Sequence, residues 1–347
     1  MRALITGAAG LIGSHVSMSL LKDGWDIVGI DNDSRATFFG SDGSTHAALA
    51  QLIRQPRYRH IVSDVADHEM MTRLVGELEP RLLVHAAAQP SHDTAAKIPF
   101  LDARTNVLGT LSVLEAIRRS PYCMRETLMV HLSTNKVYGD NPNRVDIREL
   151  ATRYDYVDGR AGIDESMPVM NGVHSLFGVS KLAADAYVIE YGKNFGMKTV
   201  SLRCGCLTGP SHASVEAHGF MSYIVKCAML GTPYKIYGYK GKQVRDQLHA
   251  ADVARLVKRL LEQPPAPGSA FNVGGGRKNS ISILEAIDAI ECITGKHLSA
   301  EYVDQPRTGD HICYITDNAA ITAATGWRPT LCLDTIINDI AEGVTKR

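Results

Sequence analysis

The sequence predicts an α/β fold in which a doubly wound parallel sheet is covered by helices on both faces. Short apolar runs alternate with segments of helical period, and a glycine-rich turn joins the first run to the first helix. The chain has 347 residues and 45% hydrophobic content, enough to bury one large core or two modest ones. Alternating strands and helices build parallel sheets with both faces buried. We expect such a sheet, followed by a smaller C-terminal α/β lobe.

The first half of the chain carries the alternation most clearly. A strand at residues 3–6 leads into the glycine turn, and a helix with apolar residues at Leu11, Val16 and Leu20 stops at Gly24. A second strand follows at 26–30. The further elements expected in this half are strands at 60–63, 81–86, 127–132 and 198–203 and helices at 67–78, 101–118 and 178–193.

After residue 204 the pattern loosens into segments punctuated by glycine and proline. Two clear helices are expected there, at 252–263 and 282–294, and only the short proline-rich stretch at 263–268 interrupts them. We find neither a low-complexity linker nor an internal repeat, so the two parts should be closely joined. The expected division is a first domain at residues 1–200 and a smaller lobe at 201–347, with a segment near 245–263 packing back on the first domain.

Composition narrows the class of protein. Lysine plus arginine and aspartate plus glutamate number 37 each, so no net charge attracts nucleic acid or an anionic membrane. The start of the chain lacks the apolar run of a secretory signal, and no stretch approaches the roughly 20 apolar residues that span a bilayer. Seven cysteines without a CxxC pair argue against a disulfide framework and a zinc site. We expect a cytoplasmic protein with free thiols, no metal, and no nucleic-acid or membrane partner.

The glycine turn predicts a dinucleotide site. Gly7, Gly10 and Gly13 between a strand and a helix let backbone N–H groups approach a pyrophosphate at the helix N-terminus. The same glycines could instead serve only close packing of the helix on the strand. The second strand ends at Asp31, about 20 residues later, where a carboxylate can accept hydrogen bonds from the adenosine ribose and would repel a 2′-phosphate. The pattern therefore favours a Rossmann-type domain that binds NAD rather than NADP.

Further motifs follow the later strands. Residues 85–88 (His-Ala-Ala-Ala), residues 133–139 (Ser-Thr-Asn-Lys-Val-Tyr-Gly) and Lys181 early in a helix occur in the order found in the extended short-chain dehydrogenase family, which this sequence resembles over nearly its whole length. More narrowly, it is similar to the CDP-paratose (CDP-tyvelose) 2-epimerase branch in four segments: 133–140, 162–165, 174–175 and 242–250.

This resemblance implies an enzyme with a tightly held NAD⁺ that takes a hydride from a carbon of a nucleotide-activated sugar. The resulting ketone would be reduced again on its other face, so the product would be an epimer. Asp64, after the third strand, could meet the adenine amino group or could cap the next helix. The implied cofactor contacts are Gly7, Gly10, Leu11, Ile12, Gly13, Asp31, Asn32, Asp64, Val65, Ala86, Ala87, Ala88, Asn106 and Lys181.

The catalytic motif departs from the family at one position. Relatives have a tyrosine four residues before the lysine, on the same helix face, and here that position holds Phe177. In the family, the lysine lowers the pKa of the tyrosine, which removes the sugar hydroxyl proton while the residue equivalent to Thr134 holds the same oxygen. A phenylalanine cannot take a proton. The expected catalytic set is therefore Thr134 and Lys181, with Phe177 in place of the usual base.

Three interpretations of Phe177 remain open at this stage. Another residue could serve as the base, the reaction could be an elimination or an epimerisation next to an existing keto group, or the protein could bind nucleotide sugar and NAD without turnover. A standard 4,6-dehydration is disfavoured, because Asn135 and Lys136 replace the acidic pair that such dehydratases carry after the threonine. We favour the epimerase, with these candidate bases: His92, Asp93, Lys136, Tyr138, His174, Cys206 and Lys181.

The substrate diphosphate calls for arginine, whose planar fork fits phosphate oxygens. Arg245 and Arg307 match family positions that contact the diphosphate, although either could be a surface arginine paired with aspartate. Cys206 stands where many relatives have asparagine. The subfamily resemblance suggests a cytidine nucleotide. The residues implied to bind substrate are Gln89, Asn135, Lys136, His174, Cys206, Arg245 and Arg307.

Two further expectations concern larger segments. The long polar stretch at 144–172 is a hypothetical lid over the sugar, because connections of this size are usually functional or mobile. Family members often dimerise through two helices of each subunit, and the helices at 101–118 and 178–193 could form that bundle in a homodimer. Burial inside a single chain would produce the same apolar pattern.

Overall fold

The computed structural model describes residues 1–306 and 310–346, and its centre is a parallel sheet of seven strands. The strand order is β12-β8-β5-β4-β1-β2-β3, so the order reverses between β1 and β4. Every neighbouring pair is parallel. The predicted doubly wound fold is confirmed. Its strands are β1 (Arg2–Thr6), β2 (Asp26–Ile30), β3 (Tyr58–Ile61), β4 (Leu82–His85), β5 (Leu128–Thr134), β8 (Thr199–Cys204) and β12 (Ser269–Val273).

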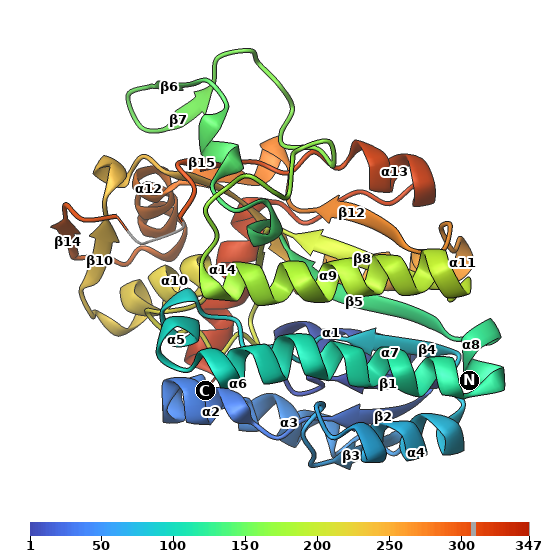
Figure 1. The fold of residues 1–347 in the computed structure, drawn as a ribbon. Coiled ribbons are helices and arrows are strands. Elements are labelled where there is room, and N and C mark those ends of the chain that lie inside the picture. Colours follow the sequence, from blue (N-terminus) through green and yellow to red (C-terminus); the bar gives the residue numbers. More distant parts are fainter. Residues whose placement is uncertain (307–309, 347) are drawn as a thin grey trace.

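Helices cover both faces of this sheet (Figure 1). α1 (Leu11–Lys22) and α11 (Ala250–Glu262) pack together on one face. α4 (His68–Leu78), α7 (Gly109–Arg119) and α9 (Leu176–Phe195) lie side by side on the other. The two faces have separate apolar cores, which explains why the strands are continuous hydrophobic runs.

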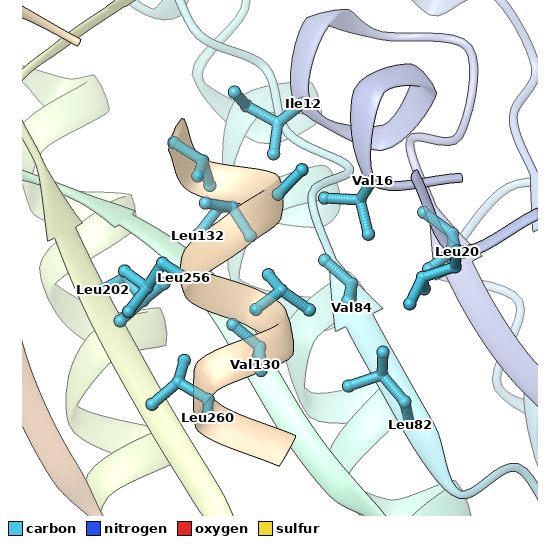
Figure 2. Close-up of a cluster of buried hydrophobic side chains, with 14 of the residues drawn as sticks. Ile12, Val16, Leu20, Leu82, Val84, Val130, Leu132, Leu202, Leu256 and Leu260 are labelled. Carbon is cyan, nitrogen blue, oxygen red and sulfur yellow. The ribbon is translucent and has the colours of Figure 1, made fainter. Parts of the chain in front are cut away.

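Figure 2 shows the core beneath α1 and α11. Side chains from both helices, among them Val16 and Leu256, meet strand residues that point to this face, such as Val84 and Val130. Leu83, the neighbour of Val84, points to the opposite core, as the alternation along a strand requires. The packing fixes where α1 begins, and therefore where its N-terminus meets the sheet.

The chain after β8 builds a smaller lobe and then returns to the sheet. β12 adds an edge strand beside β8, and α11 packs on α1. β8 includes residue 200, so the boundary that we propose between the first domain (residues 1–200) and the lobe lies inside this strand. The lobe comprises β9 (Cys206–Thr208), α10 (Phe220–Leu230), β10 (Tyr234–Tyr237), β11 (Val244–His249), β13 (Ser280–Ser282), α12 (Ile283–Thr294), β14 (Ala300–Val303), β15 (Cys313–Tyr314) and α14 (Leu333–Thr345).

The helix predicted at 101–118 is divided. It comprises α6 (Pro99–Ala103), a π-helical turn at residues 104–108, and α7. The Thr110 hydroxyl donates to the Asn106 carbonyl (2.7 Å), which competes with the regular helical bond there. The remaining short elements are α2 (Ser34–Phe39), α3 (His46–Leu52), α5 (His92–Lys97), α8 (Pro121–Glu126), α13 (Ala319–Thr325) and the hairpin β6 (Ile147–Glu149) and β7 (Tyr154–Tyr156).

The hairpin β6–β7 lies within the polar stretch 144–172 and projects at the top of Figure 1. Arg153 pairs with Glu285 (3.3 Å), and Arg277 pairs with Asp155 (2.9 Å), so ion pairs tie the hairpin to the C-terminal lobe. Within residues 1–306 and 310–346, every helix is too short or too polar to cross a bilayer.

Candidate active site

A cavity of about 420 Å³ lies between the carboxyl edge of the sheet and the C-terminal lobe. Its lining begins at the glycine turn after β1 and continues past the ends of β4, β5 and β8. It extends to Arg245 on β11 and to Tyr237 at the end of β10. In open α/β sheets, ligands bind at this edge, where the strand order reverses.

The three glycines of the turn have two kinds of role. Gly7 has a φ of +65°, and a Cβ there would lie 2.6 Å from the backbone nitrogen of Ala87. A Cβ at Gly13 would lie 2.1 Å from the Gly7 carbonyl oxygen, so both glycines are needed for close packing. Gly10 has only that carbonyl nearby, at 3.2 Å, and its open side faces the cavity.

The N-terminus of α1 fits a pyrophosphate. Gly10 is its N-cap residue, and no side chain caps this helix end. Leu11 and Ile12 line the cavity beside it. Backbone N–H groups at the uncapped end, together with the helix dipole, favour an anion there. The glycine cradle and the helix end therefore have the form that a dinucleotide requires.

Asp31 and Asn32 hold the turn after β2 and do not line the cavity. The Asp31 carboxylate accepts hydrogen bonds from the backbone N–H groups of Ala9 (3.0 Å) and Asp33 (2.9 Å). Burial raises the pKa of Asp31 despite these bonds. Arg35, which sequence reasoning missed, does line the cavity and donates to the Ala213 carbonyl (2.6 Å). Its position four residues after Asp31 was the available signal.

The other cofactor residues expected from the sequence fall into two groups. Ala86 and Ala88 line the cavity, whereas Ala87, Asp64, Val65 and Asn106 do not. Asp64 accepts from the Ala66 N–H (2.9 Å) and pairs with Arg104 (3.1 Å). The alternative of Asp64 as a helix cap is wrong, because Asp67 caps α4 by accepting from the Met70 N–H (3.0 Å).

Gln89 and Asn106 belong to a buried polar cluster behind the cavity. The Gln89 backbone N–H donates to Asn106 Oδ1 (2.9 Å), and its side chain donates to Asp102 Oδ1 (2.7 Å). Asn106 Nδ2 donates to Ser180 Oγ (3.0 Å). This cluster fastens the loop after β4 to α9. Gln89, expected to bind substrate, is fully buried instead.

Thr134, Phe177 and Lys181 all line the cavity. Lys181 Nζ donates to the Leu132 carbonyl (2.7 Å), and burial lowers the pKa of this lysine to about 8. The Lys136 backbone N–H donates to Thr134 Oγ1 (3.3 Å). The structure thus brings together the three residues of the expected catalytic set.

Two buried imidazoles lie behind Lys181. His131 Nε2 is 3.4 Å from Lys181 Nζ, and the rings of His131 and His85 stack at 5.3 Å between centroids. Burial, helped by the nearby lysine charge, lowers the pKa of His85 to about 3 and that of His131 well below its usual value. Both rings are therefore neutral. His131 had no sequence signal beyond its place in a buried strand.

The candidate bases separate by position. Tyr138 is fully buried and donates to Asn272 Oδ1 (2.7 Å), and His174 contacts the carbonyls of Val137 (3.0 Å) and Gly172 (3.1 Å). Neither lines the cavity, so both have structural positions. The candidates that do line it are His92, Asp93, Lys136, Cys206 and Lys181.

Lys136, Arg245, Asp310 and Cys206 form the far wall. Asp310 Oδ1 is 2.5 Å from Arg245 Nη2 and 3.6 Å from Lys136 Nζ. Burial would raise the pKa of Asp310, but the two cations hold it well below its usual range. Burial lowers the pKa of Lys136 to about 8 and raises that of Cys206 to about 11. With Lys136 protonated, the wall carries one net positive charge, which suits an anionic substrate.

Several lining residues had not been anticipated. Gln243, directly before β11, and Gln247, within it, lie two residues to either side of Arg245, so the two-residue period of a strand was the available signal. Arg307 lies outside the described residues. Among the described residues that line the cavity, none comes from the stretch 144–172, so the lid hypothesis gains no support. The lobe also contributes His212, His218, Phe220, Tyr223, Tyr234 and Ile283.

Comparisons with known proteins agree with this geometry. A model of the NAD dependent epimerase/dehydratase family matches residues 3–274. The CDP-paratose 2-epimerase of Salmonella typhi is 33% identical over 337 residues, which span 95% of this chain and 95% of that protein. The dTDP-glucose 4,6-dehydratase of Salmonella typhimurium is 28% identical over 342 residues, covering 95% of this chain and 88% of the relative.

Solved structures share the fold along the whole chain. A tyrosine-to-phenylalanine mutant of UDP-glucuronic acid 4-epimerase from Bacillus cereus, in complex with a fluorinated UDP-sugar and NAD, matches with a TM-score of 0.80 and 25% identity, covering 100% of this chain and 99% of its own. The UDP-glucose 4-epimerase of Thermus thermophilus, in complex with NAD, matches with a TM-score of 0.78 and 26% identity, covering 99% of each chain.

The buried lysine predicts a pH-dependent stability. The Lys181 pKa of about 8 lies below the 10.5 of an ordinary lysine, so between these values the unfolded chain binds more protons and stability rises with pH. Lys181→Met removes this contribution. We expect the free energy of unfolding of the variant, relative to wild type, to fall by about 1–3 kcal/mol from pH 8 to pH 10 in urea titrations without cofactor. Lys22→Met, at an exposed lysine, should show no such slope.

Proposed function

This chain belongs to the NAD-dependent epimerase/dehydratase family, and we propose that it is an epimerase that inverts one carbon of a nucleotide-activated sugar by transient oxidation. The observation that carries the proposal is the single cavity that joins the glycine cradle to Thr134, Lys181 and Arg245. An epimerase of this kind needs a dinucleotide and a sugar diphosphate in contact. This cavity has a candidate site for each, at the glycine turn and at Arg245.

NAD is the cofactor, and when bound it supplies hydride acceptance and return. The residues that would hold it are the glycine turn and the N-terminus of α1 at the pyrophosphate, with Lys181 near the nicotinamide ribose. Thr134 would hold the reacting sugar oxygen. Arg245 would bind the diphosphate, because its guanidinium keeps its charge and already lies in the cavity wall.

The residues after Thr134 favour epimerisation over dehydration. Loss of water needs an acid and a base beside the sugar, whereas the chain has Asn135 and Lys136 there. The nearby carboxylate of Asp310 is engaged by Lys136 and Arg245. The CDP-paratose 2-epimerase, to which this chain is 33% identical, supports a CDP-sugar as substrate. We therefore propose a CDP-hexose 2-epimerase that acts in the cytoplasm.

A second candidate, a nucleotide-sugar and NAD binder without turnover, is favoured by one observation. Phe177 occupies the position of the family's catalytic tyrosine, and the ring lines the cavity where a hydroxyl would be needed. A keto-sugar epimerase or dehydratase with another base would also be compatible with this residue. The retention of Lys181 and Thr134 in the cavity supports turnover.

We further propose a homodimer that forms through α9 and the residues near α7. Large apolar side chains on these elements are solvent-exposed, with Leu108, Val179 and Tyr187 at 53%, 50% and 41% exposure. Apolar residues gathered on adjacent helices are typical of a subunit interface. Light scattering should give the mass of two chains, and a mass of one chain across micromolar concentrations would refute the dimer.

The proposed activity predicts a product of unchanged mass. Purified protein incubated with CDP-, UDP- and GDP-hexoses, including 6-deoxy and 3,6-dideoxy forms, should convert a CDP-sugar to its C2 epimer, as followed by NMR and mass spectrometry. The cofactor should return to NAD⁺ after each turnover, so the absorbance of reduced cofactor should not accumulate. Loss of water from the sugar would indicate a dehydratase, and tight binding with no product from any sugar would favour the binder.

Arg245→Ala should weaken substrate binding more than it slows the reaction. Loss of a charge-assisted bond to phosphate costs about 1.5–3 kcal/mol, which corresponds to a KM raised roughly 10- to 150-fold. The bound NAD content should not change, because Arg245 lies on β11, away from the glycine turn. Arg259→Ala, at an exposed arginine paired with Glu262, is the matched control. An unchanged KM for the variant at position 245 would remove Arg245 from the diphosphate site.

A further inference from the structure

We propose that His92 is the proton-transfer residue of this site and replaces the tyrosine that Phe177 displaces. The proposal rests on the proposed epimerase function and deepens it. His92 is the first residue of α5, directly after the loop that leaves the carboxyl end of β4. It lines the same cavity as Thr134 and Lys181, and it is partly exposed there.

The imidazole of His92 touches the ring that lacks the hydroxyl. The ring centroids of His92 and Phe177 are 5.1 Å apart, with the planes inclined by 70°, so the two rings meet edge to face. In relatives the hydroxyl projects from the ring at this position. His92 therefore lies beside the ring from which the family's hydroxyl would project, and it lines the same cavity as Lys181.

Ser175 fixes the orientation of His92. His92 Nδ1 is 2.6 Å from Ser175 Oγ, and this oxygen also accepts a hydrogen bond from the Gly178 N–H (3.1 Å) as the N-cap of α9. In our proposal, Nδ1–H donates to Ser175 Oγ, so Nε2 carries the lone pair that a base requires. The base is then tied to the helix that carries Phe177 and Lys181.

The other lining candidates are less suited to this step. Lys136 lies within ion-pair distance of Asp310, and the Cys206 thiol is held protonated by its raised pKa. Lys181 is engaged with the Leu132 carbonyl. Asp93 is exposed rather than enclosed. Among these residues, His92 alone combines contact with the Phe177 ring and an imidazole, which can both accept a proton and return it.

The proposed step is balanced. The proton of the sugar hydroxyl passes to His92 Nε2 while the hydride of the same carbon passes to bound NAD⁺, and the C–O single bond becomes a C=O bond. In the return step the hydride adds to the opposite face of the ketone. The imidazolium then gives its proton back to the oxygen. One turnover leaves both His92 and the cofactor in their starting states.

The first test compares three variants in the full-length protein: His92→Gln, His92→Ala and the control His46→Gln, which changes an exposed histidine. Removal of a general base typically slows a reaction about 10²- to 10⁴-fold, so kcat should fall by that factor in both His92 variants. KM and bound NAD should stay within about threefold of wild type. Added imidazole should raise the kcat of His92→Ala about tenfold or more, because it can occupy the space that the side chain leaves.

The second test adds Phe177→Tyr to His92→Gln. A tyrosine at this position would share a helix face with Lys181. The kcat of the double variant should therefore be about tenfold higher than that of His92→Gln, or more. This comparison also serves if His92→Ala fails to fold. A residue that only supports the loop would not be rescued by a new hydroxyl on α9 or by free imidazole.

The outcomes separate the two proposals. If wild type converts a nucleotide sugar and His92→Gln retains its kcat, the role of His92 is refuted and the epimerase stands. A slow His92→Gln that loses NAD, with rescue neither by imidazole nor by Phe177→Tyr, would assign His92 a structural role and also refute it. If wild type binds NAD and nucleotide sugar but converts none, the proposed function fails, and the role of His92 fails with it.

Discussion

The position of α9 on the carboxyl end of the sheet is the constraint on which the site depends. Asp185 on this helix pairs with Arg203 of β8 (2.8 Å) and accepts from Ser201 Oγ (2.6 Å), and all three side chains are buried. A buried ion pair of this kind is costly to break from one side. Lys181, one helical turn before Asp185, is fixed by the Leu132 carbonyl. Together these contacts fix the position of α9 against the sheet, and therefore the position of Phe177 at the start of this helix.

Burial destabilises the charged forms of the lysines that line the cavity. Lys181 and Lys136 each have a pKa lowered to about 8, while the histidines behind Lys181 are held neutral. Such a site stabilises an incoming diphosphate, because positive charge is already in place with little water to screen it. The burial of these charged groups also lowers the folding stability of the protein, which is a common property of functional sites.

Two features of this chain bear on the reaction that we propose for it, and both line the cavity. The relatives similar to this chain include a CDP-paratose 2-epimerase and dTDP-glucose 4,6-dehydratases. In this chain, Asn135 and Lys136 follow Thr134, and the ring of Phe177 contacts that of His92. The loop after β4 and the start of α9 meet at that point. In our proposal, the proton-transfer group lies at the start of α5 instead of on α9.

The sequence by itself determined what local patterns encode: the strand, glycine turn and helix at residues 3–21, the parallel sheet, and the grouping of Thr134, Phe177 and Lys181, which all line the cavity. It missed edge strand β12, the division of the helix at 101–118, and the burial of Gln89. Those features depend on partners distant along the chain, as when Thr110 takes the Asn106 carbonyl and a cluster encloses Gln89. The meeting of His92 with Phe177 is of the same kind, because only packing of the β4 loop on α9 joins segments so far apart in sequence.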